Sequence, residues 1–318
     1  MHFMELAIMA KNRYLVLLVV TLSTFFWGSN FNVGASVVAQ SSPYVVATER
    51  FTIATIIILI FMLAKDRNNI TTLQKNWIAF IVLGLLGITG FNLAFFIGLK
   101  TTSAINGALI MATSPLTTAL LAAIIDKHKI TLVQTVGMLI SFFGVVMIVS
   151  NGSIINLVSL SFSSGDLIIM MGNLAWATYT VGSRKYISNS TPLQTTTYTM
   201  LFGTIGIILF TIYNNNLLIS INNITIKNHL LLVYMAVCGT VLAYLFWNLG
   251  IKKIGAANTA VFFNLVPIFT MILALFTGLE PNPVQISGAL IVIGGVILAT
   301  GSYKTLLAKL NTKSFTNR

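Results

Sequence analysis

Apolar segments long enough to cross a lipid bilayer occur five times in the first half of this chain and five times in the second. A helix that crosses the ~30 Å hydrocarbon core needs roughly 20 apolar residues. Because five is an odd number of crossings, a second set of five must be inverted relative to the first. Two inverted repeats packed together form an architecture in which secondary transporters build a substrate site near the membrane midplane.

The composition excludes a soluble protein. The chain has 318 residues, of which 56% are apolar and only 8% are charged, whereas soluble domains carry about 25% charged residues. The apolar runs are continuous, without the alternation of a membrane β-barrel. We therefore expect an all-α integral membrane protein with ten transmembrane helices, at 14–37, 43–64, 77–99, 103–124, 132–150, 164–187, 192–213, 229–251, 255–277 and 283–302.

A secretory signal peptide is the alternative interpretation of residues 11–30. Lys11 and Arg13 precede a run of leucines and valines, as in the first two regions of such a peptide. However, Trp27 and Asn30 stand where a cleavage site with small residues is required, and the apolar run continues beyond them. We therefore expect this segment to be retained as the first transmembrane helix.

The positive charges indicate the orientation in the membrane. Fifteen of the eighteen lysines and arginines fall in the two tails and in alternate loops between the expected helices. Cytoplasmic loops collect such residues, so both termini are placed in the cytoplasm. The expected units are a cytoplasmic N-terminal tail, the first five-helix repeat, a periplasmic linker, the second five-helix repeat and a basic cytoplasmic tail, at 1–13, 14–150, 151–163, 164–302 and 303–318.

The two halves can be aligned directly. The matching pairs are Trp27 with Trp176 and Pro43 with Pro192 at a shift of 149, Lys100, Asn106 and Pro115 with Lys252, Asn258 and Pro267 at a shift of 152, and Gln134, Gly137 and Gly144 with Gln285, Gly288 and Gly295 at a shift of 151. The order of the pairs and the steady offset indicate an internal duplication.

Four segments carry a resemblance to a known family. The segments FFWGSNFNVG (25–34), ERFTIA (49–54), GDLIIMMGNLAWATYTVGSRKY (165–186) and GALIVIGGVILAT (288–300) resemble the EamA branch of the drug/metabolite transporter superfamily. The resemblance covers all ten spans. It implies a carrier of small metabolites in the bacterial inner membrane, often an exporter of amino acids, and it says little about the particular substrate.

Two prolines are candidate hinges. Pro115 and Pro267 each lie twelve residues into their span, which at 1.5 Å per residue is ~18 Å deep. Each proline removes a backbone hydrogen bond to the carbonyl four residues earlier, at Met111 and Phe263. We expect these carbonyls to be orphaned and to face protein or a wet cavity. A static kink used only for packing is the alternative.

Amide and aromatic side chains are frequent at depth and are candidates for a substrate cavity. They are Trp27 and Asn30 on the first span, Asn92 on the third, Asn173, Trp176 and Tyr179 on the sixth, Tyr244 and Asn248 on the eighth, and Asn264 on the ninth. The alternative for the amides is hydrogen bonding between helices, worth about 0.6 kcal/mol per bond. The alternative for the aromatic residues is an ordinary core.

Few charged residues lie within the spans. Glu49 and Arg50 are near the outer end of the second helix; Glu49 is a candidate proton-coupling site, and Arg50 could snorkel or hold a carbonyl or a substrate carboxylate. A purely structural role is the alternative for both. We expect Asp166 to complement the dipole at the start of the sixth helix, and Asp126 and Glu280 to be solvated turn residues.

Other classes of function lack the residues that they need. Cys238 is the only cysteine, the three histidines (His2, His128 and His229) lie at helix ends or in tails, and neither a metalloprotease pattern nor an ATP-binding loop is present. We therefore expect no enzyme activity, cofactor or metal site. The net charge of +12 follows from the loops and indicates membrane orientation rather than nucleic-acid binding.

The sequence thus predicts a secondary transporter for a small neutral or zwitterionic metabolite, such as an amino acid, in a bacterial inner membrane. A phosphorylated or nucleotide-linked sugar is the alternative substrate, although a phosphate requires Arg or Lys near the midplane and only Arg50 is available. A receptor or structural protein that transports nothing is the second alternative. Besides substrate and lipid, the expected partners include a possible second copy of the chain, through the paired glycines.

Overall fold

The computed structural model describes residues 13–38, 41–66, 69–127, 129–158, 160, 162–214, 225–278 and 280–302. Most of the expected N-terminal tail, the expected C-terminal tail from residue 303 onward, His2 and His128 lie outside the described residues.

Every regular element in the described part of the chain is a helix. The elements are α2 (Arg13–Val38), α3 (Pro43–Lys65), α4 (Asn69–Gly84), η1 (Leu85–Gly90), α5 (Phe91–Gly98), α6 (Ala104–Ala112), α7 (Ser114–Ile125), α8 (Leu132–Val149), α9 (Ile154–Val158), α10 (Ser164–Lys185), α11 (Pro192–Asn214), α13 (Ile226–Ala236), η2 (Val237–Leu242), α14 (Ala243–Ile254), α15 (Ala256–Val261), η3 (Phe262–Leu265), α16 (Val266–Ala274), η4 (Leu275–Thr277) and α17 (Pro283–Ala299).

Eight helical segments are long and apolar enough to cross a membrane, so the chain is a multi-pass membrane protein. Two further expected spans are helical but are not among the eight. Helix α17 is apolar and has 17 residues. Helix α10 has 22 residues, and its Asn, Thr, Ser and Gly residues make it more polar than the others.

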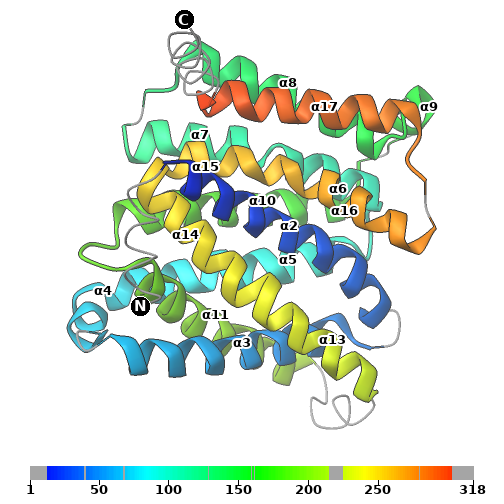
Figure 1. The fold of residues 1–318 in the computed structure, drawn as a ribbon. Helices are drawn as coiled ribbons and strands as arrows, with labels where there is room; N and C mark the ends of the chain where they lie inside the picture. Colours follow the sequence, from blue (N-terminus) through cyan, green and yellow to red (C-terminus); the bar gives the residue numbers. More distant parts are fainter. Residues whose placement is uncertain are drawn as a thin grey trace, which may run out of the picture.

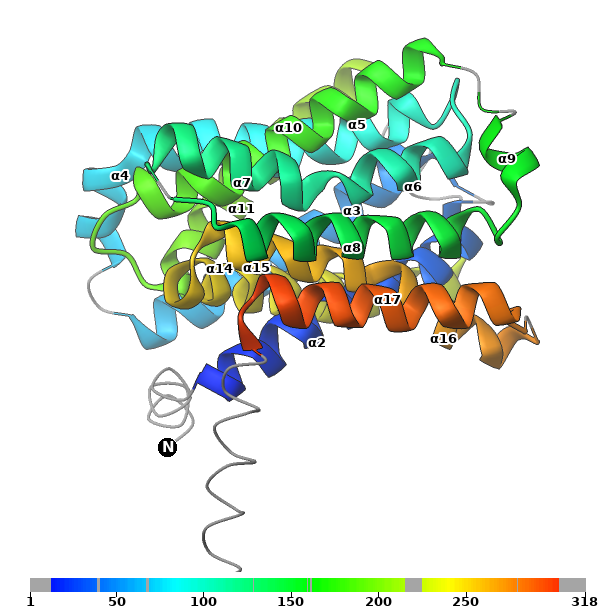
Figure 2. The same cartoon turned by 90° about the horizontal axis from the view of Figure 1, so that it is seen from above.

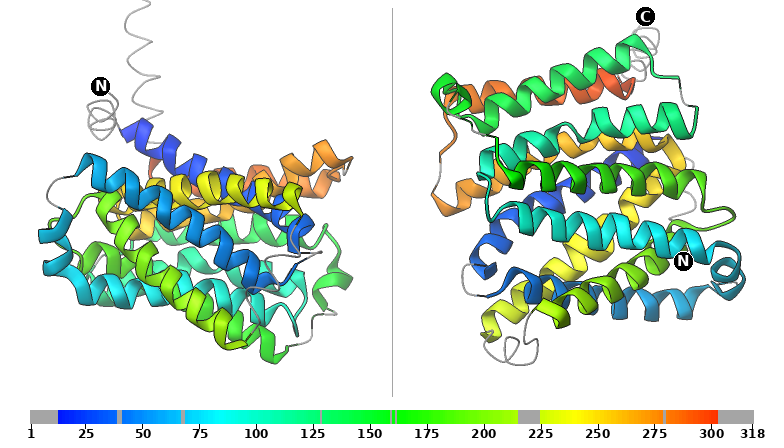
Figure 3. Two further views of the ribbon diagram at one scale, coloured as in Figure 1. Left: turned by 90° about the horizontal axis from the view of Figure 1, so that it is seen from below. Right: turned by 180° about the vertical axis from the view of Figure 1, so that it is seen from behind.

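The long helices run side by side, so that their ends gather at two opposite ends of the molecule (Figure 1). The views from below and behind show the same arrangement (Figure 3). The first and last described helices reach the same end, because the Arg13 guanidinium donates to the carbonyl of Thr300, at 2.9 Å. We call this the basic end, since the last turn of α10 also carries Arg184 and Lys185 there.

Helices α8 and α17 form the most extensive helix pair and lie against each other in Figure 2. Small residues allow this approach. A Cβ atom on Gly144 would lie 2.7 Å from the carbonyl oxygen of Gly288, and one on Gly295 would lie 2.7 Å from that of Gly137. Glycines at such positions let two backbones come together. The paired glycines therefore join the two halves of this one chain.

Two π-helices interrupt the longest spans. The spans Ile70–Gly98 and Ile226–Ile254 each have 29 residues and contain η1 and η2 in their middle. The two π-helices start at Leu85 and Val237, a shift of 152 residues. A π-helix inserts one residue into a helical turn and changes which backbone groups are paired, and such bulges frequently occur at functional sites.

Both prolines follow a break in their helix, but the Phe263 carbonyl behaves differently from our expectation. Pro115 lies in the first turn of α7, after a break at Thr113, and Pro267 lies in the first turn of α16, after the 3₁₀ turn η3. The prediction that the Phe263 carbonyl is orphaned is wrong, because it accepts a hydrogen bond from the Val266 amide. The tighter 3₁₀ winding replaces the lost bond with one that spans three residues.

Asp166 occupies the expected place at the start of α10. It forms a capping box with Ser163, in which the Ser163 hydroxyl accepts from the Asp166 amide and the carboxylate accepts from the Ser163 amide. The same carboxylate accepts from Thr102, and from the Asn106 amide group at 3.1 Å. Asp166 therefore satisfies the helix start and fastens the turn before α6 to it.

Candidate functional site

Aromatic side chains from three long helical segments contact one another and form a cluster. Trp27 of α2 and Trp176 of α10 have ring centroids 5.5 Å apart, and Tyr244 of α14 lies 5.8 and 5.7 Å from these two rings. Tyr179 stacks on Trp176 at 5.3 Å. The structure therefore brings together all four of the aromatic residues that the sequence placed in the site.

Two more rings belong to this aromatic cluster and were missed in the sequence. Trp247 lies 5.0 Å from Trp27, and Phe263 lies 5.6 Å from the same ring. The signal was present: Trp247 is one helical turn after Tyr244, and Phe263 directly precedes Asn264. The aromatic cluster (Trp27, Trp176, Tyr179, Tyr244, Trp247 and Phe263) thus draws rings from both halves of the chain.

Asn248 lies beside the aromatic cluster in a fixed orientation. Its amide nitrogen donates to the Tyr179 hydroxyl at 2.7 Å and to the Thr196 hydroxyl at 3.0 Å. The Thr196 hydroxyl donates its own proton to the Pro192 carbonyl, at 2.7 Å, so it can only accept from Asn248. The amide oxygen of Asn248 therefore points away from these partners, and it is buried with no hydrogen bond.

Asn30 packs against the π-helix η2. A methyl group added to Gly239 would overlap the Asn30 amide group, so only glycine leaves room for this side chain. Both polar atoms of the Asn30 amide are buried and have no hydrogen-bond partner. The neighbouring Trp27 donates its indole N–H to the Gly239 carbonyl, at 3.1 Å. This part of η2 therefore receives two of the expected site residues.

Asn92 follows η1, at the position that corresponds to Tyr244 after η2 at the shift of 152 residues. It donates to the carbonyl of Ile88 at 2.8 Å and also hydrogen-bonds the hydroxyl of Tyr244. The amide nitrogen carries two N–H groups, so it can donate both to its own helix and to the Tyr244 oxygen. Asn92 is therefore joined to the aromatic cluster through Tyr244.

Asn173 and Asn264 contact the two broken helices. Asn173 donates to the carbonyl of Ile110 at 3.2 Å and to the hydroxyl of Thr113 at 2.9 Å, which is the break before Pro115. Asn264 lies within η3 and donates to the Ser141 hydroxyl of α8, at 3.0 Å. These two amides therefore lie where each proline-containing helix changes direction.

Unpartnered polar atoms concentrate among these residues. Side chains of Asn173, Trp176 and Asn248 are only 3%, 1% and 4% exposed. Within the described part of the chain, the buried side-chain atoms of this region that have no hydrogen bond are Asn30 Nδ2 and Oδ1, Ser114 Oγ, Thr118 Oγ1, Asn173 Oδ1, Trp176 Nε1, Asn248 Oδ1 and Asn264 Oδ1. Native proteins hydrogen-bond the large majority of such atoms, so this concentration marks a candidate polar binding site.

Glu49 and Arg50 have separate partners. The Glu49 carboxylate lies 2.5 Å from Nδ1 of His229, in the first turn of α13. The Arg50 guanidinium donates to the Thr240 hydroxyl at 2.7 Å and to the Gly239 carbonyl at 3.3 Å. Arg50 thus holds a carbonyl of η2, one of the roles considered from sequence. The His229 contact was missed, since this histidine was read only as a helix-end residue.

Asp126 is partly exposed at the end of α7, but it has partners that the sequence did not predict. Its carboxylate pairs with Arg184 at 3.5 Å and with Lys185 at 3.9 Å. The sequence placed Asp126 in a turn without the partners that the fold supplies from the end of α10. Glu280 is exposed, as expected.

This fold and this site define a multi-pass membrane protein with a buried polar and aromatic centre, and the comparisons identify its family. A model of the EamA-like transporter family matches residues 14–150 and again residues 163–301. The chain belongs to the EamA-like transporter family.

The similar proteins are themselves described as transporters. The chain is 42% identical over 302 residues to the uncharacterized transporter YyaM of Bacillus subtilis (strain 168), covering 95% of this chain and 97% of that protein. It is 28% identical over 286 residues to an uncharacterized transporter of Archaeoglobus fulgidus, covering 89% and 96% of the two chains. A crystal structure aligns with a TM-score of 0.77 at 18% identity over 93% of this chain and 99% of the other, which shows the fold alone.

Proposed function

We propose that this protein is a secondary transporter that moves a small neutral or zwitterionic metabolite, an amino acid or a related compound, across the bacterial inner membrane by alternating access. The observation that carries the proposal is the set of unpartnered polar atoms of Asn173, Trp176 and Asn248 beside the aromatic cluster. Burying a polar atom without a hydrogen bond costs about 1–3 kcal/mol, and a polar solute can supply the missing partners.

The architecture that we propose is ten transmembrane helices in two inverted five-helix repeats. The two π-helices support it, because η1 holds Tyr179 of the second half against Gly87, whereas η2 holds Asn30 of the first half against Gly239. Tyr179 and Asn30 are 149 residues apart, and the two glycines are 152 apart. Each half therefore offers the same contact to the other, as a pseudo-twofold relation requires.

We further propose that both termini are cytoplasmic. The contact between Arg13 and Thr300 supports this by bringing the first and last described helices to one end. That end also carries Arg184 and Lys185, and cytoplasmic ends of membrane proteins collect such residues. The basic end therefore faces the cytoplasm, and the end with Glu49 and His229 faces outward.

The chemistry around the aromatic cluster favours a substrate with both donors and acceptors. The amide oxygens of Asn173 and Asn248 are fixed acceptors, because their nitrogens are committed to Ile110 and to Tyr179. They suit an ammonium group, which has only donors, and aromatic faces attract the same group. Trp176 Nε1 is an unpartnered donor that suits a carboxylate. A phosphorylated solute is disfavoured, because Arg50 is already bound to Thr240 and Gly239.

The proline breaks are the proposed moving parts. Thr113 and the 3₁₀ turn η3 interrupt the fourth and ninth spans beside Asn173 and Asn264. Breaks of this kind let the two parts of a helix change angle. We propose that Pro115 and Pro267 are hinges about which the repeats rock, so that the site opens to one side at a time.

A transport assay tests this function. Purified protein in liposomes is offered labelled amino acids, with and without a proton gradient. We expect uptake that Trp176→Ala and Asn248→Ala abolish while folding is retained. Trp77→Ala is the matched control, because Trp77 is 53% exposed on α4 and makes none of the ring contacts of the cluster, so its loss should leave uptake unchanged.

Three outcomes are informative. Normal uptake in both site variants would place the substrate elsewhere in the protein. No uptake of any amino acid, together with uptake of a sugar phosphate, would replace the proposed substrate class. For proton coupling through Glu49, uptake that ignores the gradient and survives Glu49→Gln would end the idea.

A further inference from the structure

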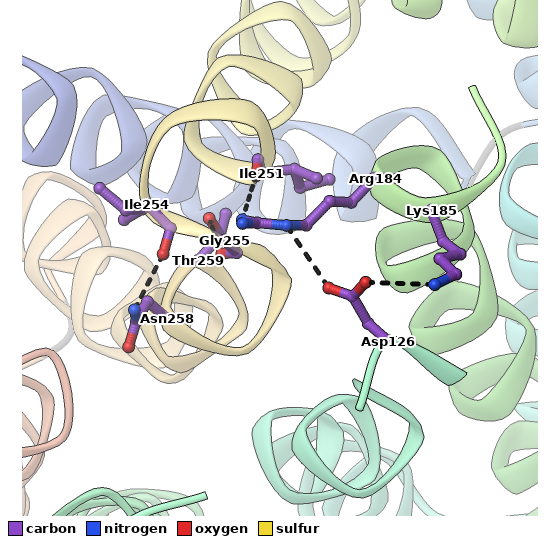
Figure 4. Close-up of polar contacts among 8 residues, drawn as sticks. All are labelled: Asp126, Arg184, Lys185, Ile251, Ile254, Gly255, Asn258 and Thr259. Carbon is purple, nitrogen blue, oxygen red and sulfur yellow. Dashed lines mark hydrogen bonds and ion pairs between the residues drawn. The ribbon is translucent and has the colours of Figure 1, made fainter. Parts of the chain in front are cut away.

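Three helix ends meet around Arg184 at the basic end (Figure 4). Its guanidinium Nε lies 3.5 Å from the carboxylate of Asp126, which caps the end of α7. Its Nη1 donates to the carbonyl of Ile251, in the last turn of α14, at 3.2 Å. Lys185 adds a second, longer contact to the same carboxylate, at 3.9 Å. One arginine therefore ties α7 of the first half to α14 of the second.

The backbone next to this cation is shaped to admit it. Gly255 separates α14 from α15 and has φ +92°, a conformation that favours glycine. A Cβ atom on Gly255 would lie 2.6 Å from Nη1 of Arg184. The turn that joins the eighth and ninth spans thus leaves the space that the guanidinium occupies.

The helix dipoles explain the position of Arg184 but not that of Asp126. A cation at the end of α14 is favoured, because the last carbonyls of a helix carry partial negative charge. Asp126 stands at the C-terminal end of α7, where its own helix disfavours a negative charge. Its position is therefore explained by Arg184 and Lys185 across the interface rather than by α7.

The opposite end of the molecule has no counterpart of this pair in sequence. At the shift of 149 residues, Arg184 corresponds to Ala35, and at the shift of 152 residues, Asp126 corresponds to Gly278. Neither position can form an ion pair. The opposite end has a different contact between the halves, that of Glu49 of α3 with His229 of α13, so the pair of Asp126 and Arg184 belongs to the basic end alone.

We propose that Asp126 and Arg184 are positioning residues that hold the basic end closed and bias the transporter toward the state that is open at the other end. The inference rests on the proposed alternating access. Opening the basic end must separate the ends of α7, α10 and α14, which these contacts join. The ion pair does not drive the conformational change by itself; it shifts the equilibrium toward the state that is closed at the basic end.

The expected size of the bias follows from exposure. The side chains of Arg184 and Asp126 are 42% and 27% exposed, so water and salt screen the pair. Removing the Asp126 charge should therefore increase the population of the state open at the basic end by about two- to fivefold. Removing the Arg184 side chain should have a larger effect, because it also frees the Ile251 carbonyl.

Accessibility of an engineered cysteine tests the bias without any substrate. The full chain carries Cys238→Ser and Ala257→Cys, since Ala257 is buried in α15, which packs against α7 and α10. A maleimide that cannot cross membranes is applied from the basic side of sealed vesicles. We expect its reaction rate to rise by about two- to fivefold with Asp126→Asn, and by more with Arg184→Gln.

Two matched variants make the result specific. Lys253→Gln removes an exposed positive charge from the same end of α14 and should leave the rate unchanged. The exchange of charges in Asp126→Arg with Arg184→Asp should return the rate toward that of the parent. Unchanged labelling in both single variants, or an equal rise with Lys253→Gln, would overturn the proposal.

Transport kinetics separate this inference from the proposed function. If the parent protein transports an amino acid, Asp126→Asn should change the KM measured from the two sides of the membrane in opposite directions. If the parent transports an amino acid but the variants show unchanged labelling and unchanged KM, the role of the ion pair is overturned and the proposed function remains supported. If the parent moves none of the offered solutes but the two single variants are labelled faster than the parent, the role of the ion pair is supported and the proposed substrate class is not.

Discussion

The two π-helices occupy corresponding positions, yet their surroundings differ in polarity. At η1, Gly87 packs against the Cβ atom and ring of Tyr179, whose hydroxyl is bound by Asn248. At η2, Gly239 packs against the Asn30 amide, both of whose polar atoms lack partners. The same backbone device thus holds a large, hydrogen-bonded side chain in one half and a small, unsatisfied amide in the other.

The hydrogen bonds made at the two π-helices also differ. The Gly239 carbonyl of η2 accepts from both Trp27 and Arg50, and Thr240 beside it accepts from Arg50 as well. At η1, the comparable contact is that of Thr89, whose hydroxyl donates to the Gly203 carbonyl of α11. We infer that η1 serves mainly to pack the two halves together, whereas η2 also organises polar groups next to the aromatic cluster.

The largest expected effect separates the two glycines. In Gly87→Ala the new methyl group meets Tyr179 atoms next to the backbone, which cannot move away, so we expect a loss of about 3 kcal/mol in the free energy of unfolding. In Gly239→Ala the Asn30 amide is the far end of its side chain and can rotate, so the loss should be about 1 kcal/mol. The measurement is unfolding in mixed detergent micelles.

The control for this comparison is Gly294→Ala, because Gly294 of α17 has open space where the Cβ would be added. It should cause no loss of stability. We expect Gly239→Ala to reduce transport more than its stability loss accounts for, since it moves Asn30. Equal destabilisation by the two π-helix variants would contradict the difference between η1 and η2.

A comparable effect is expected from Arg50→Gln. Hydrogen bonds that involve a charged group contribute about 1.5–3 kcal/mol, and Arg50 makes two of them at η2. The corresponding residue in the second half is Thr199, whose hydroxyl donates to the Thr195 carbonyl of its own helix and also hydrogen-bonds Tyr179 of α10, so that its bonds join only neutral groups. Thr199→Val should therefore cost well under half as much as Arg50→Gln in the same unfolding measurement. A similar cost for both would show that η2 does not depend on Arg50.

The sequence revealed most of what apolar length and duplication determine. The approximate helix bounds, the spans that contain the two prolines and the four aromatic residues that the structure brings together follow from periodicity and from matched positions. Trp27 and Trp176 could be paired from the repeat alone, because equivalent positions in two related halves meet near the axis that relates them.

The sequence could not reveal contacts that depend on how the halves are packed. A π-helix has no composition of its own, and η1 and η2 read as ordinary apolar spans. Glu49 and His229 are 180 residues apart, and Asp126 and Arg184 come from different repeats. Loop composition gives no sign of such pairs, because they form only when two helix ends from distant parts of the chain are brought together.

The two tryptophans of the repeat supply the next test. Trp27 donates its indole N–H to the Gly239 carbonyl, whereas Trp176 Nε1 has no partner. Trp27→Phe and Trp176→Phe remove similar volumes from the same aromatic cluster, so their packing costs should match. Trp27→Phe loses one further hydrogen bond and should be less stable by about 1 kcal/mol.

Trp176→Phe should instead act on transport, raising KM for the substrate whose acceptor the indole N–H meets. Equal stability of the two variants would show that the hydrogen bond from Trp27 to η2 does not contribute to stability. Unchanged KM in Trp176→Phe would leave its unpartnered N–H without a ligand.

The smallest expected effect concerns the two threonines of the π-helices. Thr89→Val removes one hydrogen bond, to the Gly203 carbonyl, and should cost about 0.6 kcal/mol, as such bonds do within membranes. Thr240→Val removes a bond to the Met235 carbonyl and also the acceptor of Arg50.

A double-mutant cycle of Thr240→Val with Arg50→Gln should therefore show coupling, because each change removes the same contact. The cycle of Thr89→Val with Arg50→Gln should be additive, since no described contact joins those two residues. Additivity in both cycles would mean that the polar network around η2 does not act as a unit, and the two π-helices would then differ in shape alone.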